Sequence, residues 1–170
     1  MREKTKKLCY IALAAAVLAV LSPWAIYITA VPITFSFLAV LLISWLFEPK
    51  VAFCATLVYV ALGAVGVPIF AGFVGGFQVL AGPTGGFIMS YPIISLLSSR
   101  FGTNMTKKLV FGVLSAILTY LIGFGWLSIT TETDFVAAFF SLSYLFVIFD
   151  LVKIVAAAFL SGEIKKRLRI

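Results

Sequence analysis

The sequence predicts an all-α polytopic membrane protein that forms a single domain of six transmembrane helices over residues 1–170. Of the 170 residues, 63% are hydrophobic and only 11% are charged, and the mean hydropathy is +1.18. A soluble domain contains about 45–50% apolar and about 25% charged residues. The apolar residues also fall into runs flanked by basic residues, which is typical of membrane proteins.

Each of the six apolar runs is a predicted helix. A bilayer core about 30 Å thick requires about 20 helical residues. The first, fifth and sixth runs reach this length, whereas we expect the shorter middle three to extend into flanking loops or to bend. All six are apolar around their whole circumference, as buried or lipid-facing helices are. The predicted helices span 8–29, 32–47, 51–67, 84–99, 109–130 and 135–160.

The basic residues predict how the chain is oriented. All 13 Lys and Arg residues except Lys153 lie at the two ends of the chain, or between the second and third or the fourth and fifth runs. The connection between the last two runs carries Glu132 and Asp134 instead. Because Lys and Arg concentrate in cytoplasmic loops, we expect a multi-pass protein of the cell membrane with both termini cytoplasmic. This topology explains the net charge of +7 without a nucleic-acid partner.

Missing residue types narrow the chemistry. The chain contains no His, which excludes His-based acid–base catalysis and argues against zinc and haem sites. No G-x-x-x-x-G-K-[ST] motif is present to hold ATP phosphates. We therefore expect neither an enzyme nor a bound cofactor or metal. If transport consumes ATP, another chain must hydrolyse it.

The main candidate site is a charged pair inside the last apolar run. Asp150 and Lys153 stand in LFVIFDLVKIVAAAFL, three residues apart, where a helix places them on one face. Each charge costs about 2.5–3.5 kcal/mol at the centre of a membrane helix. One interpretation is a structural ion pair that neutralises itself. The other, which we favour, is that the pair faces a cavity and contacts a small ligand with hydrogen-bond donors and an anionic group.

A second candidate region is the glycine-rich connection GVPIFAGFVGGFQVLAGPTGGF, residues 66–87. Its bulky aromatic side chains, including Phe70 and Phe77, do not suit a flexible linker. We expect it to fold back into the outer mouth of the bundle, since irregular backbone at membrane depth must be buried or line a cavity. Gln78 and Thr84 are its candidate polar groups, and Thr84 is a predicted helix N-cap. The alternative is a packed loop without a ligand.

The first run carries small residues at helical spacing. Ala12 and Ala16, and likewise Ala15 and Ala19, are four residues apart. Small residues at this spacing allow membrane helices to approach closely. The stripe is therefore either an internal packing face or a docking strip for a partner membrane protein.

Four motifs in order, VPIT (31–34), GVPIFAG (66–72), GPTGG (82–86) and DLVK (150–153), resemble the BioY family. Its members are the biotin-specific substrate-binding (S) components of energy-coupling factor (ECF) transporters, and the resemblance covers nearly the whole chain. It implies high-affinity capture of biotin from outside the cell, with a transmembrane coupling (T) protein and two ABC ATPases as partners. It also implies that the alanine stripe of the first helix is the docking surface.

The resemblance implies roles for individual residues. Asp150 would accept from a ureido N–H of biotin, and Lys153 would bind either the ureido carbonyl or the valerate carboxylate. The remaining predicted ligand contacts come from the glycine-rich connection and from aromatic walls: Gln78, Gly82, Thr84, Phe35, Phe70, Phe77 and Tyr144. Family members often carry Gln where this chain has Ser36, so no polar role is given to the second helix.

Two other functions remain open from the sequence. One is an S component for another vitamin, such as thiamine or riboflavin, although Lys153 argues against a cationic ligand. The other is a small membrane enzyme or structural subunit without a ligand. Labelled-biotin binding to the purified chain distinguishes all three.

Overall fold

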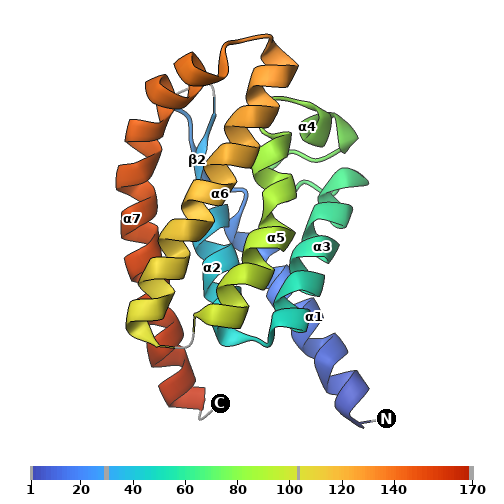
Figure 1. Ribbon diagram of the computed structural model, residues 1–170. Helices are drawn as coiled ribbons and strands as arrows, with labels where there is room; N and C mark the ends of the chain where they lie inside the picture. The colour runs from blue at the N-terminus through green and yellow to red at the C-terminus, as the bar shows by residue number, and fades with distance from the viewer. Residues whose placement is uncertain (1, 29–30, 103, 169–170) are drawn as a thin grey trace.

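The computed structural model describes residues 2–28, 31–102 and 104–168. The chain is mainly helical, with one short hairpin (Figure 1). The elements are α1 (Arg2–Leu21), β1 (Ala25–Ile26), β2 (Ile33–Thr34), α2 (Ser36–Leu46), α3 (Pro49–Ala64), α4 (Phe77–Ala81), α5 (Gly85–Phe101), α6 (Met105–Thr131) and α7 (Phe135–Leu168). The all-α prediction is confirmed in outline, with the two-residue strands as the exception.

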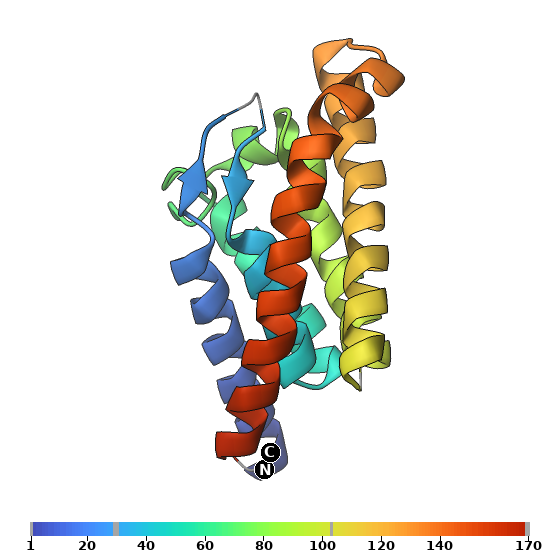
Figure 2. The same cartoon turned by 90° about the vertical axis from the view of Figure 1, so that its left-hand side faces the viewer.

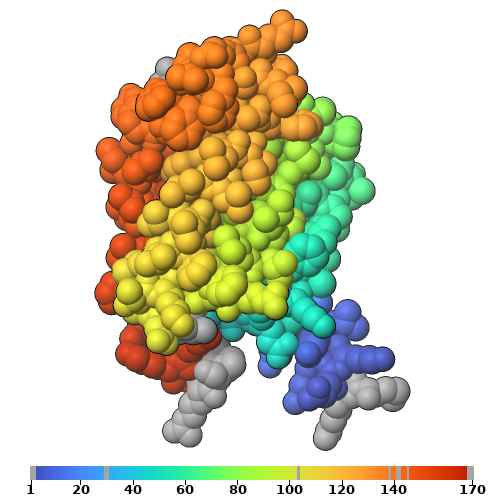
Figure 3. Space-filling model, viewed as in Figure 1, coloured from blue at the N-terminus to red at the C-terminus, as the bar shows by residue number. Residues whose placement is uncertain are grey.

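The long helices form a bundle in which α2 is the central element. Around it, α1 contacts α3, α3 contacts α5, α5 contacts α6, and α6 contacts α7. The short helix α2 packs against α1, α3, α5 and α7, and nine of its residues are buried. The face seen in Figure 3 is formed mainly by α5, α6 and α7, with α3 along one edge and α1 extending below. The start of α1 and the end of α7 lie at the same end of the bundle in Figures 1 and 2.

That end carries the basic residues and is called the basic end below. It contains the start of α3, the end of α5 and the start of α6, so the described Lys and Arg residues other than Lys153 gather there, as the sequence predicts (Figure 1). Lys108 differs from the others because it is buried. Its Nζ donates to Ser161 Oγ at 2.7 Å and lies 5.8 Å from the centroid of the Trp45 ring.

The opposite, outer end is covered by two irregular segments. The strands β1 and β2 pair antiparallel with Ala25 opposite Thr34. The glycine-rich segment 66–76 packs onto this hairpin: Gly72 N donates to Pro23 O at 2.8 Å, and the Trp24 and Phe73 rings make an edge contact. The expectation that this segment folds back onto the bundle is confirmed.

The glycine-rich segment is anchored by Phe70. Its ring is fully buried and meets Tyr59 edge-on at 5.6 Å. It also lies directly over Gly63, where an added Cβ would come within 2.0 Å of the ring. Only glycine at position 63 permits this approach, so the loop and α3 are matched to each other.

Several predicted helix boundaries are wrong. The run 8–29 is divided, because α1 ends at Leu21 and residues 25–26 form β1. Pro23 explains the end of this helix, since proline disfavours helical backbone at the residue before it. Similarly, the run 32–47 begins with β2, and the helix starts only at Ser36. The last helix continues to Leu168 rather than ending at residue 160.

The described helices differ in their capacity to span a bilayer. By length and composition, α6 is the one described helix that is long and apolar enough to cross a membrane, while α2 and α3 are apolar but shorter. The prediction of six complete spans is therefore not confirmed by helix length. The turns that interrupt the first two predicted runs, and the charges in α1, account for part of the difference.

Side chains fill the half of the bundle nearest the basic end. Fully buried apolar residues there include Leu41, Ile43, Ala52, Ile94 and Ala157. Hydroxyl pairs join the helices between them: Thr56 Oγ1 and Ser95 Oγ are 3.1 Å apart, and Ser98 Oγ and Ser115 Oγ are 2.9 Å apart. The hydroxyl groups are thereby satisfied without water, as buried polar groups require.

Candidate ligand-binding site

A cavity of about 240 Å³ lies between the outer segments and the long helices. Its wall is mainly apolar, with a minority of polar groups, which is typical of a small-molecule site. The lining residues are Tyr27, Val31, Pro32, Thr34, Ser36, Phe37, Tyr59, Ala71, Val74, Val79, Thr84, Phe87, Ile88, Tyr91, Thr119, Tyr120, Phe146, Asp150 and Lys153.

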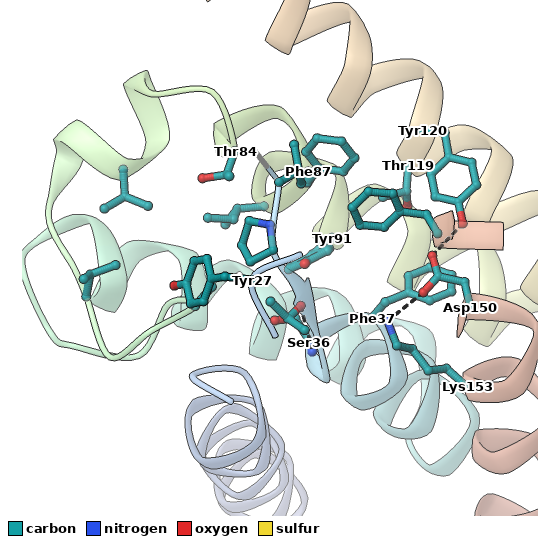
Figure 4. A pocket seen from close by; sticks show the side chains of 18 of the residues that line it. Tyr27, Ser36, Phe37, Thr84, Phe87, Tyr91, Thr119, Tyr120, Asp150 and Lys153 are labelled. Carbon is teal, nitrogen blue, oxygen red and sulfur yellow. Dashed lines mark hydrogen bonds and ion pairs between the residues drawn. The ribbon is translucent and has the colours of Figure 1, made fainter. Parts of the chain in front are cut away.

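One end of the cavity is charged. Lys153 Nζ donates to Asp150 Oδ1 at 2.7 Å, and Tyr120 Oη donates to Asp150 Oδ2 at 2.6 Å (Figure 4). All three side chains are buried, with exposed fractions of 5% for Asp150, 8% for Lys153 and 5% for Tyr120. Each oxygen of the carboxylate therefore accepts one hydrogen bond, and the two donors come from different helices, α7 and α6. The acceptor capacity left on these oxygens and the remaining N–H groups of the ammonium are available to a ligand.

Aromatic rings surround the charged pair. Phe87 of α5 and Phe146 of α7 stack with centroids 6.4 Å apart, and both rings contact Phe124 edge-on. Phe146 precedes Asp150 by four residues, which places both side chains on the same face of α7. This arrangement provides a flat apolar wall beside the polar groups.

A row of hydroxyl groups lies along the cavity between its two ends. Thr34, Ser36 and Tyr91 come from β2, α2 and α5, and all three line the cavity. Tyr59 Oη donates to Ile69 O at 3.2 Å, which connects the cavity wall to the start of the glycine-rich segment. Figure 4 shows Ser36 and Tyr91 between the charged pair and the outer loops.

The outer end is formed by the two covering segments. Tyr27 follows β1, Ala71 and Val74 belong to the glycine-rich segment, and Thr84 stands immediately before α5. The approach to α5 is fixed by Trp126, whose Nε1 donates to Gly82 O at 3.0 Å. The first N–H groups of α5 have no partner within their own helix, so this end suits an anion or a carbonyl oxygen.

The structure brings together three of the predicted ligand contacts: Asp150, Lys153 and Thr84 all line the cavity. Ser36, which received no polar role from the sequence, also lines it. The binding roles of these residues stay predictions, but their common location is now defined.

Six other predicted contacts do not line the cavity. Phe70 is buried beneath the loop against Tyr59, and Gly82 holds Trp126 through its carbonyl. Gln78 is exposed and donates to Gly75 O at 3.2 Å. The remaining three are exposed at their side chains: Phe35 by 48%, Phe77 by 71% and Tyr144 by 66%.

Helix geometry explains the position of Tyr144. Six residues correspond to about 600° of rotation, so Tyr144 points well away from the face of Asp150. The aromatic residue on that face is Phe146, which precedes Asp150 by four residues. This helical spacing could have been read from the sequence.

The alanine stripe of α1 divides into two faces. Ala15 is 5% exposed and Ala19 packs partly against the core, so these two serve the internal packing interpretation. Ala12 and Ala16 are exposed and remain available to a partner.

Most of the aromatic and hydroxyl side chains that line the cavity were not predicted from the sequence. Tyr120 and Tyr91 each place a hydroxyl group within an apolar run. That hydroxyl group is the one feature of the local sequence that could have marked them as site residues. Their convergence on Asp150 and Ser36 depends on how α2, α5, α6 and α7 pack, and no local pattern predicts that.

Comparison with known proteins places the chain in a family. A family model described as the BioY family matches residues 1–170. The chain is 38% identical over 136 residues to biotin transporter BioY2 of Lactococcus lactis subsp. cremoris, covering 77% of this chain and 74% of that protein. It is 32% identical over 162 residues to the probable biotin transporter BioY of Pyrococcus horikoshii, covering 95% and 98%.

A solved structure has the same fold. The crystal structure of the S-component for biotin from an ECF-type ABC transporter superposes with a TM-score of 0.86 at 21% identity, covering 97% of this chain and 93% of that one. BioY biotin transporters are membrane proteins. The whole-length family match and these relatives show that the chain belongs to the BioY family.

Proposed function

We propose that this chain is the biotin-binding S component of an ECF-type ABC transporter, which captures biotin at the outer face for uptake. The observation that carries the proposal is the cavity in which the buried Asp150–Lys153 pair meets an aromatic wall. Membership of the BioY family and the names of the relatives support the same substrate. The chain acts in transport and is not an enzyme.

The chemistry of biotin matches the two ends of the cavity. Its ureido ring offers two N–H donors and one carbonyl acceptor, which suit the carboxylate of Asp150 and the ammonium of Lys153. The thiophane ring lies against Phe87 and Phe146. The valerate chain extends outward, and its carboxylate meets Thr84 at the N-terminus of α5.

We further propose a six-span arrangement in the cell membrane, with α1, α2, α3, α5, α6 and α7 crossing and α4 lying in the outer loop. The concentration of Lys and Arg at one end supports a cytoplasmic location for that end and hence for both termini. The shorter helices are continued by the irregular segments at the outer end, which contact one another and line the cavity, as irregular backbone at membrane depth requires.

The proposed partners are a T protein and two ABC ATPases, because no nucleotide-binding motif is present in this sequence. The exposed Ala12 and Ala16 of α1 provide a small-residue surface on which a helix of the T protein can pack closely.

Equilibrium binding of labelled biotin to the detergent-purified chain tests the proposal. We expect tight, saturable binding that excess thiamine and riboflavin do not displace. Displacement by either vitamin would identify an S component of different specificity. An absence of biotin binding to folded protein would overturn the proposal.

A further inference from the structure

The hydroxyl group of Tyr120 is the only described donor from another helix that reaches the Asp150 carboxylate. It donates to Oδ2 across 2.6 Å, although the two residues are 30 positions apart in the sequence. Lys153, by contrast, belongs to the same helix as Asp150 and occupies Oδ1. The orientation of the carboxylate within the cavity therefore depends on how α6 packs against α7 (Figure 4).

The Tyr120 ring has a fixed position. It contacts Phe124 at 6.0 Å and Phe146 at 6.5 Å between centroids, and the residue is 5% exposed. Aromatic packing of this kind stabilises the ring independently of its hydroxyl. The Oη atom is thus held at a defined point beside Asp150, and the substitution Tyr120→Phe removes that atom while retaining the ring.

Donors on both oxygens restrict the carboxylate. Each oxygen has two lone-pair positions, and one on each is already used by the protein. An incoming N–H group therefore has to approach along the lone-pair directions that remain. A carboxylate held by Lys153 alone could turn about its χ2 angle and accept donors from a wider range of directions.

We propose that Tyr120 is a positioning residue that makes the site selective for a ring with N–H donors, namely the cyclic urea of biotin. This inference rests on the proposed function. It adds that the specificity for N–H groups depends on a residue of α6 that contacts Asp150, and not on the Asp150–Lys153 pair alone.

The experiment compares Tyr120→Phe with the unaltered chain, using biotin and two analogues that each carry a methyl group on one ureido nitrogen. We expect Tyr120→Phe to weaken biotin binding by about 10- to 100-fold, because a hydrogen bond to a charged group is lost. For at least one methylated analogue the loss should be less than about threefold, since the N–H that Asp150 accepts is already absent. Tyr144→Phe is the matched control, because Tyr144 is exposed on α7 and does not line the cavity. It should leave all three affinities unchanged.

Two results would overturn the inference. One is unaltered biotin affinity in Tyr120→Phe. The other is an equal loss for all three ligands, which would indicate a general packing role. Thermal unfolding checks that the variant is folded. The same substitution in an Asp150→Asn background gives a second readout, where its effect should largely disappear. Failure of the unaltered chain to bind biotin would instead overturn the proposed function, so the two failures are distinguishable.

Discussion

Two buried lysines of this protein have opposite surroundings. Lys153 on α7 is 8% exposed and Lys108 on α6 is 6% exposed. Each donates one hydrogen bond of 2.7 Å to a residue of α7. The acceptor of Lys153 is the carboxylate of Asp150 beside a cavity, whereas Lys108 bonds the neutral Ser161 hydroxyl and lies over the Trp45 ring.

The difference follows from the positions of the two lysines along the bundle. Lys108 lies in the first turn of α6 at the basic end, where a hydroxyl group and an aromatic ring contact its ammonium. Lys153 lies deeper, so its charge requires a carboxylate partner to be tolerated. The cavity therefore presents a pair with no net charge that keeps strong donors and acceptors. That combination suits a polar ring without requiring an ionic one.

The largest expected effect is on stability, when only one charge of the Asp150–Lys153 pair is removed. Lys153→Leu leaves a buried carboxylate with Tyr120 as its remaining described donor, and we expect a loss of about 3–5 kcal/mol in the free energy of unfolding. Replacing both Asp150 and Lys153 by Leu should restore stability to the wild-type value or above it. Thermal unfolding in detergent measures both. A double variant as unstable as the single one would show that the pair itself stabilises the fold.

Biotin affinity should fall by a slightly smaller amount when either partner is altered. We expect Asp150→Asn and Lys153→Ala each to weaken binding by about 2–5 kcal/mol, because each leaves a buried polar partner unpaired. Equilibrium binding of labelled biotin gives the values. Wild-type affinity in both variants would make the pair purely structural.

Ser161→Ala tests the surroundings of Lys108, and we expect a smaller loss of stability than for Lys153→Leu. The Lys108 ammonium would lose its described hydrogen-bond acceptor, destabilising the protein by about 1–3 kcal/mol. Biotin affinity should not change. Ser44→Ala is a suitable control, since the buried Ser44 Oγ also donates to a backbone carbonyl of its own helix but has no lysine among its described partners. Equal destabilisation by the two substitutions would show that Lys108 gains nothing from Ser161.

The smallest effect is expected for Lys108→Met. The substitution keeps an unbranched side chain in the same space and removes a charge that has no described carboxylate partner. We expect the free energy of unfolding to change by less than about 1 kcal/mol, in either direction. Biotin affinity should stay within twofold of wild type in the same binding assay. A tenfold loss would mean that the two lysine sites are coupled through α6 and α7.

The same contrast shows what the sequence can predict. Lys153 is recognisable because a charge stands alone in an apolar run, and i+3 spacing predicts its partner Asp150 directly. From the sequence, Lys108 cannot be distinguished from the other basic residues of a predicted cytoplasmic loop. Its burial depends on the meeting of α2, α6 and α7, which no local pattern encodes.

Helix existence was predictable, but boundaries at the outer end were not. Hydropathy merges Ala25 and Ile26 with the preceding helix because the β1 strand is as apolar as the helix itself. Proline at position 23 is the local signal for the break. The residues that line the cavity differ in the same way. Asp150 and Lys153 were predictable from the sequence of one helix, whereas the positions of Tyr120 and Tyr91 depend on how several helices pack.

The tightly filled half of the bundle below the cavity has a consequence for transport. On the side of the basic end, a molecule held at Asp150 meets packed side chains, since Leu41, Ile94 and Ala157 are fully buried among the described residues. Passage to the far side of the membrane therefore requires the protein to move. Either the helices must separate, or the loaded protein must change its orientation as a body, and ATP-driven partners would then act on the carrier rather than on a pore.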